Sequence, residues 1–504
     1  MKREFWIITV IFLIGIAIRF LSTWPYNTII GFDQARDLFD ARSIILDHDI
    51  KIIGPTAGNN PNLHHGVAYL YYLILPIFIG GGNPAAVAVW NSFFNAGAVI
   101  AVYFLTKSLF KSEWAAIVAS IITGVSYYYT QFAGWLSNPT VTLLTVPVFF
   151  LCVWEYYKGK KWGLPLAAFF LGLTIQFELF FIYLIPTGIL AWIILRPKLP
   201  NFKLFFISLA AFLAAMSSMI VTEFKFNFEG VKSVLLAGNF VGGGNEGNFF
   251  QSAFNFLQKW EAFYLNFWPQ NRMFGVYFGL LVVGIFIFEI IKNRKVKEIV
   301  KRNLFLILWF FSPMIMLLIG VHNAPWFLIG RPAAAIIMGS YFISKIKPKF
   351  LTALVTGLIV SANLLAIKNA YGRSQPLLEP DPSSILSTQV AAMEYTYQKS
   401  KGQSFAIDTV TNPLYINAVW AWNYDWYGKK YDMKPTWLGG DQIHPYDTLE
   451  KASGPEKYLF LITDQTNRIP PVYKENAVNS MKKRARLVEE KHFDGITVQM
   501  WQKR

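Results

Sequence analysis

Apolar stretches of about 20 residues recur along most of this chain, and they constrain its fold more than any other feature. A membrane-spanning helix needs roughly 20 mostly apolar residues to cross about 30 Å of hydrocarbon. Only 15% of the residues are charged, whereas ordinary soluble domains carry about 25%. The stretches that are long enough are residues 4–22, 84–107, 113–131, 139–157, 162–178, 180–195, 203–221, 274–291, 303–320, 326–344 and 350–368. We therefore predict an α-helical polytopic membrane protein, with about 11 transmembrane helices within residues 1–369.

The basic residues of the short loops predict the orientation. Cytoplasmic loops of membrane proteins carry an excess of Lys and Arg. If the N-terminus is cytoplasmic, every inside loop is basic, including 292–302, whereas the short outer turns at 132–138 and 321–325 carry no Lys or Arg. The first stretch follows Lys2 and Arg3 and has no small-residue cleavage site, so we interpret it as a retained anchor. These features predict a multi-pass protein with a cytoplasmic N-terminus and an extracytoplasmic C-terminal tail.

The net charge of +16 does not indicate a nucleic-acid partner. The tail, residues 370–504, has 17 basic and 15 acidic residues, so the excess is mostly the positive charge of the cytoplasmic loops. The single cysteine, Cys152, excludes an intrachain disulfide, a Cys-rich zinc site and an iron–sulfur cluster. Basic inner loops without disulfides suit the plasma (inner) membrane of a prokaryote.

The nearly neutral tail is predicted to be a small extracytoplasmic α/β domain. Helical and strand patterns alternate along it, which is typical of a layered domain. The predicted helices are 384–400, 412–428 and 475–490, and the predicted strands are 404–410, 457–464 and 496–503.

Two outer loops are long enough to contain structure. In loop 23–83, residues 34–47 have apolar side chains at helical spacing, and residues 66–80 are too short to span and are rich in tyrosine. We predict that both segments are helices in the outer interface, where tyrosine suits the headgroup boundary. The second long outer loop is 222–273.

The first outer loop concentrates acidic residues near the membrane. Asp33, Asp37 and Asp40 are spaced at i, i+4 and i+7, so one helical face can present all three, with Arg36 between them. Polar groups this close to the membrane are costly and therefore informative. Asp33 at the start of the helix also has a structural interpretation, as an N-cap.

Further polar candidates lie at other outer positions. His64 and His65 could bind a metal or a phosphate, but adjacent histidines point in different directions and no third ligand has a characteristic spacing. Asn138 lies in an uncharged turn, and Glu178 lies at an outer membrane boundary. Arg331, near the outer end of a span, either snorkels or binds an anionic headgroup.

The order of these segments resembles the GT-C superfamily of membrane glycosyltransferases. The matching stretches are GFDQARD, HHGVAYLYYLILP, GWLSNPT and LGLTIQFELFFIYLIP, and together they extend over about residues 1–220. They are most similar to bacterial relatives of protein O-mannosyltransferases and lipid A aminoarabinose transferases, known as glycosyltransferase family 39. Asp33 stands where that group has its loop aspartate, and Gln34 replaces the glutamate that often follows it.

The resemblance implies a reaction. Such enzymes take a sugar from a polyprenyl phosphate and transfer it, with inversion, to an acceptor hydroxyl on the outer face. Asp33 would be the general base, and the acceptor would be a protein, a lipid or a glycan. A lipid-phosphate leaving group needs a cation near the membrane surface. The candidate cations are Arg331, Arg272, Lys225 and His322, and the candidate acceptor or donor residues are Arg36, Asp37, His64, His65, Asn138 and Glu178. Some relatives bind divalent cations, but this sequence shows no convincing ligand set.

Other functions remain as alternatives. A secondary transporter would need midplane charges or broken helices in corresponding halves. A non-catalytic glycan- or lipid-binding membrane protein would work through its outer tail, and an oligosaccharide ligase or polymerase would differ only in the length of its donor. The glycine-rich stretch 242–248 lacks the Lys-Ser/Thr of a P-loop, which argues against an ATP-driven pump.

Overall fold

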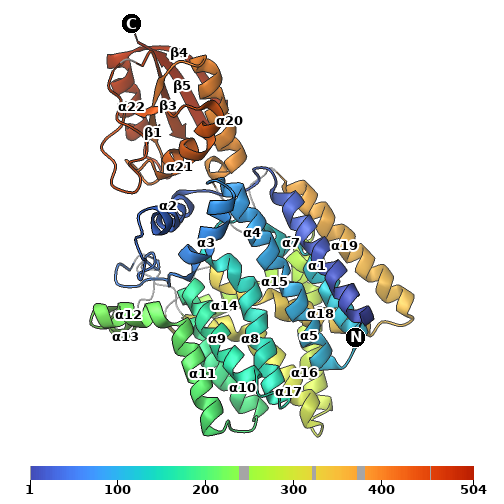
Figure 1. Cartoon of the computed structure of the whole chain (residues 1–504). Helices are drawn as coiled ribbons and strands as arrows, with labels where there is room; N and C mark the ends of the chain where they lie inside the picture. The colour runs from blue at the N-terminus through green and yellow to red at the C-terminus, as the bar shows by residue number, and fades with distance from the viewer. Residues whose placement is uncertain are drawn as a thin grey trace.

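The protein is a helical bundle with a small α/β domain at one end (Figure 1). It is represented by a computed structural model that describes residues 2–58, 60–237, 249–319, 325–371, 381–454 and 456–503. The α-helices of the first part are α1 (Lys2–Thr23), α2 (Phe32–Leu46), α3 (Ala68–Ile79), α4 (Pro84–Ala96), α5 (Ala98–Phe110), α6 (Glu113–Val125), α7 (Tyr127–Ala133), α8 (Thr142–Tyr157), α9 (Gly163–Phe177), α10 (Leu184–Leu195), α11 (Phe202–Ala215), α12 (Ser217–Lys225), α13 (Glu229–Ala237), α14 (Phe249–Leu257), α15 (Glu261–Phe267), α16 (Arg272–Lys292), α17 (Lys297–Phe311), α18 (Pro332–Ser344) and α19 (Lys349–Ala370). The 3-10 helices there are η1 (Asn138–Val141), η2 (Leu179–Tyr183), η3 (Ser312–Ile319) and η4 (Pro325–Gly330).

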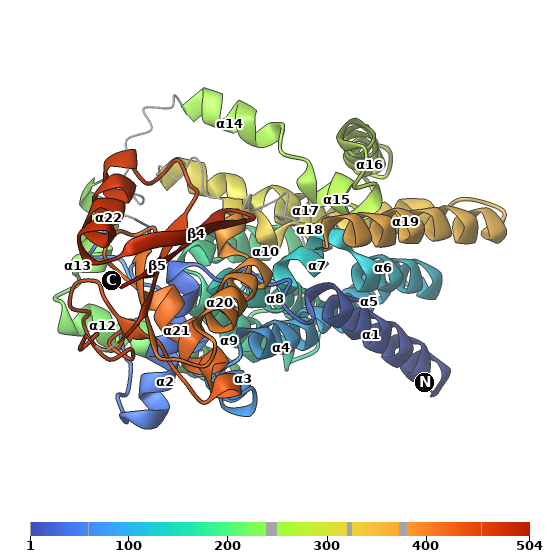
Figure 2. The ribbon, with the colours of Figure 1, turned by 90° about the horizontal axis from the view of Figure 1, so that it is seen from above.

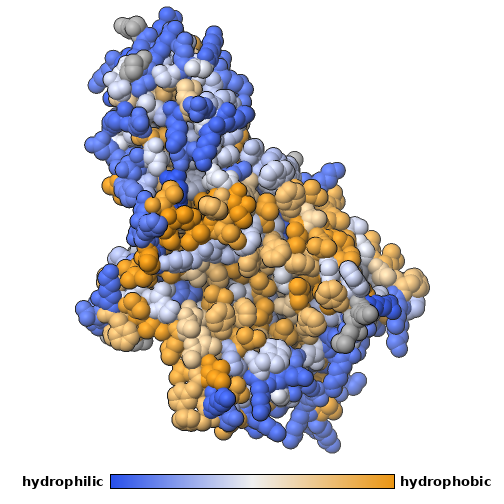
Figure 3. Space-filling model, viewed as in Figure 1, coloured by the Kyte–Doolittle hydropathy of each residue, from blue (hydrophilic) through white to orange (hydrophobic). Residues whose placement is uncertain are grey.

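Each predicted span contains helix. Six helical segments are long and apolar enough to cross a membrane: Arg3–Thr23, Pro84–Phe110, Asn138–Tyr157, Arg272–Lys292, Lys297–Leu317 and Lys349–Ala370. The pair α11 and α12, bent by 67°, adds one more if it counts as one span, and the other four predicted stretches are shorter apolar helices. An apolar belt covers the visible side of the bundle, with polar surface at both ends (Figure 3). The polytopic helical architecture is thus confirmed, while the number of crossings stays a prediction.

The predicted span 113–131 is two helices, α6 and α7, that meet at Ser126. Because α6 ends there, its last carbonyls have no helical N–H partners. The guanidinium of Arg19, within α1, donates to two of them, Thr123 O at 2.9 Å and Gly124 O at 2.7 Å. A buried cation in the first span therefore closes the end of another helix.

The basic loops lie at the end of the bundle opposite the α/β domain (Figure 1). Ion pairs tie this end together: Lys107 Nζ lies 2.6 Å from Glu4 Oε1, and Lys158 Nζ lies 3.0 Å from Glu298 Oε1. The N-terminus is at the same end. This segregation agrees with the predicted topology, and the side of the membrane that each end faces stays a prediction.

The α/β domain contains a five-stranded sheet. Its elements are η5 (Pro382–Ser384), α20 (Leu386–Ser400), β1 (Phe405–Val410), α21 (Ala418–Tyr427), η6 (Gly428–Tyr431), β2 (Thr436–Trp437), β3 (Tyr458–Asp464), α22 (Pro471–Arg484), β4 (Arg486–Phe493) and β5 (Ile496–Gln502). The strand order is β2-β1-β3-β5-β4, where β1 is parallel to β2 and β3, and β5 is antiparallel to β3 and β4. The predicted small α/β domain is confirmed.

One predicted element of this domain is wrong. The helix expected over 475–490 ends at Arg484, and the residues that follow form the edge strand β4. Asp494 and Gly495 connect β4 to β5 as a two-residue hairpin, with Gly495 at φ +77°. Asp-Gly is a strong hairpin signal, because a tight turn of this kind requires positive φ. Pairing with β5 therefore decides the conformation of this segment. The short strand β2 was also not expected.

Both helices predicted in the first outer loop are present, as α2 and α3. They lie between the bundle and the α/β domain (Figure 1). Seen from above, the domain covers the side of the bundle that contains α2, α3, α8 and α9, and it leaves α1, α5, α6, α16 and α19 uncovered (Figure 2). One buried apolar core joins α2 and α3 to the domain. The acidic loop is thus enclosed between two folded bodies.

Candidate functional site

Asp33 lies in the first turn of α2 and has a free, accessible carboxylate face. The helix begins at Phe32, and Gly31 occupies the N-cap position. The Gly31 N–H donates to the side-chain oxygen of Gln34 at 2.9 Å. The alternative interpretation of Asp33 as the N-cap is therefore wrong. The Asp33 side chain is 67% exposed, so a substrate can reach it.

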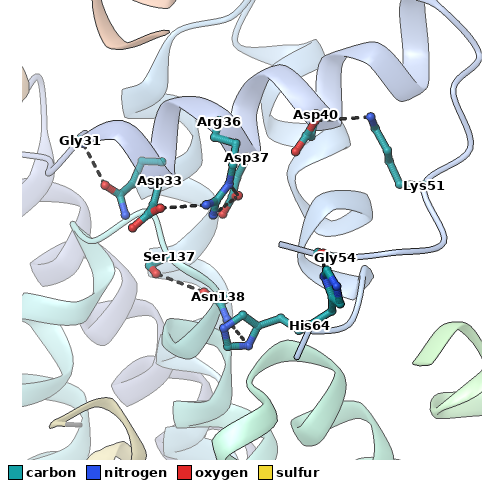
Figure 4. Close-up of polar contacts among 12 residues, drawn as sticks. Gly31, Asp33, Arg36, Asp37, Asp40, Lys51, Gly54, His64, Ser137 and Asn138 are labelled. Carbon is teal, nitrogen blue, oxygen red and sulfur yellow. Dashed lines mark hydrogen bonds and ion pairs between the residues drawn. The ribbon is translucent and has the colours of Figure 1, made fainter. Parts of the chain in front are cut away.

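Arg36 bridges two carboxylates of α2. Its Nη1 lies 2.8 Å from Asp33 Oδ1, while Nε and Nη2 donate to Asp37 Oδ1 at 3.0 and 2.8 Å. Figure 4 shows the three side chains on the side of α2 toward Ser137 and Asn138. Asp37 is only 5% exposed. The buried carboxylate thus fixes the guanidinium, and the guanidinium fixes the exposed carboxylate.

Burial raises the pKa of Asp37 to about 7, because desolvation of the carboxylate outweighs the ion pair with Arg36. The nearby charges of Asp33 and Asp40 raise it further. Burial also raises the pKa of Asp40, although Lys51 Nζ lies 3.4 Å from its Oδ1 and opposes the shift. The cluster therefore holds a carboxyl group that titrates near neutral pH.

Three predicted residues from distant parts of the chain form a second group below α2. Asn138, at the start of η1, donates from Nδ2 to Glu178 Oε2 at 3.1 Å and to the Phe177 carbonyl at 2.6 Å. The same Nδ2 lies 3.5 Å from His65 Nδ1. Glu178 is buried where α9 ends and η2 begins. The outer turns are thus held together by side chains that the sequence singled out.

The imidazole of His65 is neutral. The Leu179 N–H donates to its Nδ1 at 3.3 Å, which places the ring proton on Nε2. Burial lowers the pKa of His65 to about 3, and the positive charge of Arg36 adds to this shift. The 3.4 Å contact between His65 and Glu178 is therefore not an ion pair.

His64 points away from His65 and borders an apolar cavity. Its Nδ1 contacts the Gly54 carbonyl at 3.0 Å, and its ring stacks on Phe226. A cavity of about 300 Å³ begins at the two histidines and is otherwise lined mostly by apolar side chains of α9, η2, α10, α12 and α13. A second apolar cavity, of about 480 Å³, lies between α8, α9 and α10. Ile185, near the start of α10, lines both cavities.

Arg331 is buried rather than snorkelled, at 1% exposure in the last residue before α18. Its guanidinium lies over the rings of Phe310 and Phe256, and its Nη1 lies 3.6 Å from Glu261 Oε1. Within the described part of the chain, Nε and Nη1 have no hydrogen-bond acceptor. A buried cation with unused donors is expected to bind an anion. Tyr183, at the far end of η2 from Glu178, is its electrostatic neighbour.

The other predicted cations are not part of these groups. Arg272 is exposed in the first turn of α16, and Lys225 is exposed at the end of α12. His322 lies outside the described residues. Three residues near the site were not among the predicted site residues: Glu261 and Lys51, described above, and Tyr446 of the α/β domain, whose ring packs against Phe39 of α2. Only Lys51 had a usable signal, as a single cation that follows an acidic helix.

The possible divalent cation stays a prediction. Among the described residues, no three His, Cys, Asp or Glu side chains converge as metal ligands would. We therefore derive no step through a metal.

Comparison with known proteins identifies the fold of this chain through similar solved structures. No protein-family model and no curated protein matches the sequence. Solved structures match nearly the whole chain, and they place it in the GT-C fold class. ArnT from Cupriavidus metallidurans in the apo state has 8% identity and a TM-score of 0.61, with 99% of this chain and 98% of that chain covered.

Two further structures are similar. ArnT from the same organism bound to undecaprenyl phosphate has 8% identity and a TM-score of 0.59, with coverage of 98% and 97%. The oligosaccharyltransferase AglB from Archaeoglobus fulgidus, in complex with an inhibitory peptide and a dolichol-phosphate, has 12% identity and a TM-score of 0.44, with 92% of this chain and 69% of that chain covered. At such identities the likeness to ArnT establishes the fold, which confirms the GT-C expectation for the architecture.

Proposed function

We propose that the protein is an integral membrane glycosyltransferase that moves a sugar from a polyprenyl-phosphate donor to an acceptor hydroxyl on the outer face. One observation carries the proposal. An exposed carboxylate, held by an arginine, lies in a GT-C fold at the end of the bundle that carries the α/β domain, and an apolar cavity begins at His64 and His65. The ArnT structure with undecaprenyl phosphate supports the choice of donor.

In this reaction Asp33 is the general base. Its carboxylate takes the proton of the acceptor hydroxyl, and the oxygen attacks the anomeric carbon of the sugar. The bond from that carbon to the phosphate oxygen breaks on the opposite face, and the phosphate leaves with the electron pair, so the configuration inverts. A base must lie within hydrogen-bond reach of the proton it removes, which suits the exposed Asp33 better than the buried Asp37.

The lipid part of the donor fits the apolar cavities. An isoprenoid chain would lie in the two cavities that share Ile185 of α10. The leaving phosphate would then lie near η2, with the unused donors of Arg331 stabilising its charge. His65, Asn138 and Glu178 would line the sugar or acceptor side. The predicted roles of Arg272, Lys225 and His322 have no further support.

We place the N-terminus in the cytoplasm and the α/β domain outside the plasma membrane. The basic loops gather at the end that carries the N-terminus, as the positive-inside rule requires of a cytoplasmic face. The acceptor would accordingly approach from the extracytoplasmic side.

The decisive experiment is transfer by the purified protein in liposomes that contain radiolabelled polyprenyl-phosphate sugars. We expect time-dependent loss of label from the lipid and its appearance on an acceptor. A panel of hexose and pentose donors, offered with a serine/threonine peptide, alkyl glycosides and a glycolipid, identifies sugar and acceptor. Absence of transfer from every donor, with uptake of a labelled solute instead, would overturn the proposal in favour of transport.

The transfer rate is expected to rise with pH around neutrality. Ionised Asp37 accepts hydrogen bonds from Arg36, which in turn contacts the proposed base Asp33. Protonation of Asp37 below its pKa of about 7 weakens its attraction for Arg36, so at acid pH Arg36 positions Asp33 less well and transfer slows. In Asp37→Asn the rate should be lower and should lose this acid limb. The exposed Asp49→Asn is the matched control and should keep the wild-type profile. An unchanged profile in Asp37→Asn would contradict the assignment.

A further inference from the structure

The C-terminal domain is joined directly to the segment that carries the proposed base. The Ile30 N–H donates to the Ser384 carbonyl at 2.7 Å, and Gln389 Nε2 donates to the Ile30 carbonyl at 2.9 Å. At the other end of α2, Arg42 is ion-paired with Asp425 of α21. The domain therefore contacts the chain at both ends of α2.

Within this contact, the segment between β2 and β3 runs along α2. His444 Nε2 lies 3.7 Å from Asp47 Oδ2, at the C-terminal end of the helix. Two residues later, the ring of Tyr446 packs edge-on against Phe39 and Phe32, with centroids 5.4 and 6.4 Å apart. Tyr446 is 8% exposed, so its ring is held in place.

Tyr446 adjoins the charged cluster of α2, because the Arg36 guanidinium lies over the same Phe32 ring, 5.9 Å from its centroid. Burial and the neighbouring carboxylates raise the pKa of Tyr446 to about 12. The charged groups that influence it are Asp40, Arg36, Asp37 and Asp33. Within the described part of the chain this hydroxyl makes no hydrogen bond, and it is not one of the enclosed polar atoms, so a substrate can reach it although the ring is buried. A fixed ring with an unused hydroxyl beside an exposed carboxylate is suited to bind a substrate hydroxyl.

We propose that Tyr446 is an acceptor-binding residue that the C-terminal domain contributes to the transferase site. This inference rests on the proposed function and extends it to a domain that had no assigned role. The phenol would hydrogen-bond a hydroxyl or ring oxygen of the acceptor while Asp33 removes the proton of the reacting hydroxyl. The acceptor would thus bind beside Asp33, where the segment that contains Tyr446 meets α2.

The test compares Tyr446→Phe with wild type in the liposome transfer assay, using the acceptor that wild type accepts. The change removes the hydroxyl and keeps the ring packing. We expect the KM for the acceptor to rise about fivefold and kcat to stay within about twofold, because one hydrogen bond contributes about 1 kcal/mol and about 1.4 kcal/mol is tenfold. Tyr473→Phe is the matched control, since Tyr473 is on α22, against the opposite face of the sheet, and should leave both constants unchanged.

The outcomes separate this inference from the function on which it rests. Transfer by wild type with an unchanged KM in Tyr446→Phe would overturn only the role of Tyr446. A fall in kcat and in unfolding temperature without a change in KM would also overturn it, in favour of a packing role. Absence of transfer by wild type from any donor would overturn both proposals.

Discussion

Replacing Asp33 with asparagine is expected to lower the transfer rate by about a hundredfold or more, the scale of a lost general base. Asparagine has nearly the same shape as aspartate but cannot accept the proton of the acceptor hydroxyl. Because the side chain is 67% exposed, the change should alter the free energy of unfolding little. Arg36 keeps its two hydrogen bonds to Asp37, so the rest of the cluster stays in place.

Binding and stability measurements distinguish loss of the base from loss of donor binding or of the fold. Asp33→Asn should bind undecaprenyl phosphate as wild type does, and its unfolding temperature should be close to that of wild type. Asp49→Asn, an exposed aspartate in the same loop, should transfer at the wild-type rate. If Asp33→Asn transfers normally while Asp37→Asn is inactive, the base is Asp37, and access to that buried carboxylate must be explained.

The sequence predicted the helices because the bilayer restricts what can cross it. Backbone groups in hydrocarbon must be satisfied within the segment, so length and apolarity identify spans reliably. They do not locate breaks. The interruption at Ser126 depends on Arg19, a residue about 100 positions away whose side chain satisfies the freed carbonyls.

The candidate site was predictable where its members are close in the chain. The i, i+4 spacing on one helix brought Asp33, Arg36 and Asp37 together, as expected. The contact of Asn138 with His65 and Glu178 needed the three outer turns to converge, which only the fold determines. Tyr446 carried no signal at all, because its role depends on how a separate domain packs on α2.

The position of Arg331 at membrane depth singled it out in the sequence. The sequence did not predict that Glu261 is its partner. Glu261 lies in an ordinary amphipathic stretch of the second long outer loop, and nothing in its spacing links it to a residue 70 positions later. The structure places it 3.6 Å from the guanidinium. Variants of Arg331 and Glu261 distinguish an arginine that only neutralises Glu261 from one that binds the lipid phosphate.

Arg331→Gln is expected to lower transfer by about a hundredfold or more, because removal of one donor to a developing anion costs about 10²–10³ in rate. It should also weaken the binding of undecaprenyl phosphate to the purified protein. The single change leaves Glu261 buried without its cation, which costs about 3–5 kcal/mol of stability. A loss of activity in this variant alone therefore does not distinguish phosphate binding from a damaged fold.

The double variant Glu261→Gln/Arg331→Gln separates the two effects, since it removes both charges and restores the unfolding temperature. If Arg331 binds the phosphate, the double variant stays as inactive as Arg331→Gln, and Glu261→Gln alone binds undecaprenyl phosphate at least as tightly as wild type because its guanidinium is released. If Arg331 only neutralises Glu261, activity returns in the double variant. Nη1 approaches Glu261 Oε1 only to 3.6 Å, and Nε has no acceptor within the described part of the chain, so this guanidinium keeps donors for a phosphate, which favours the first result.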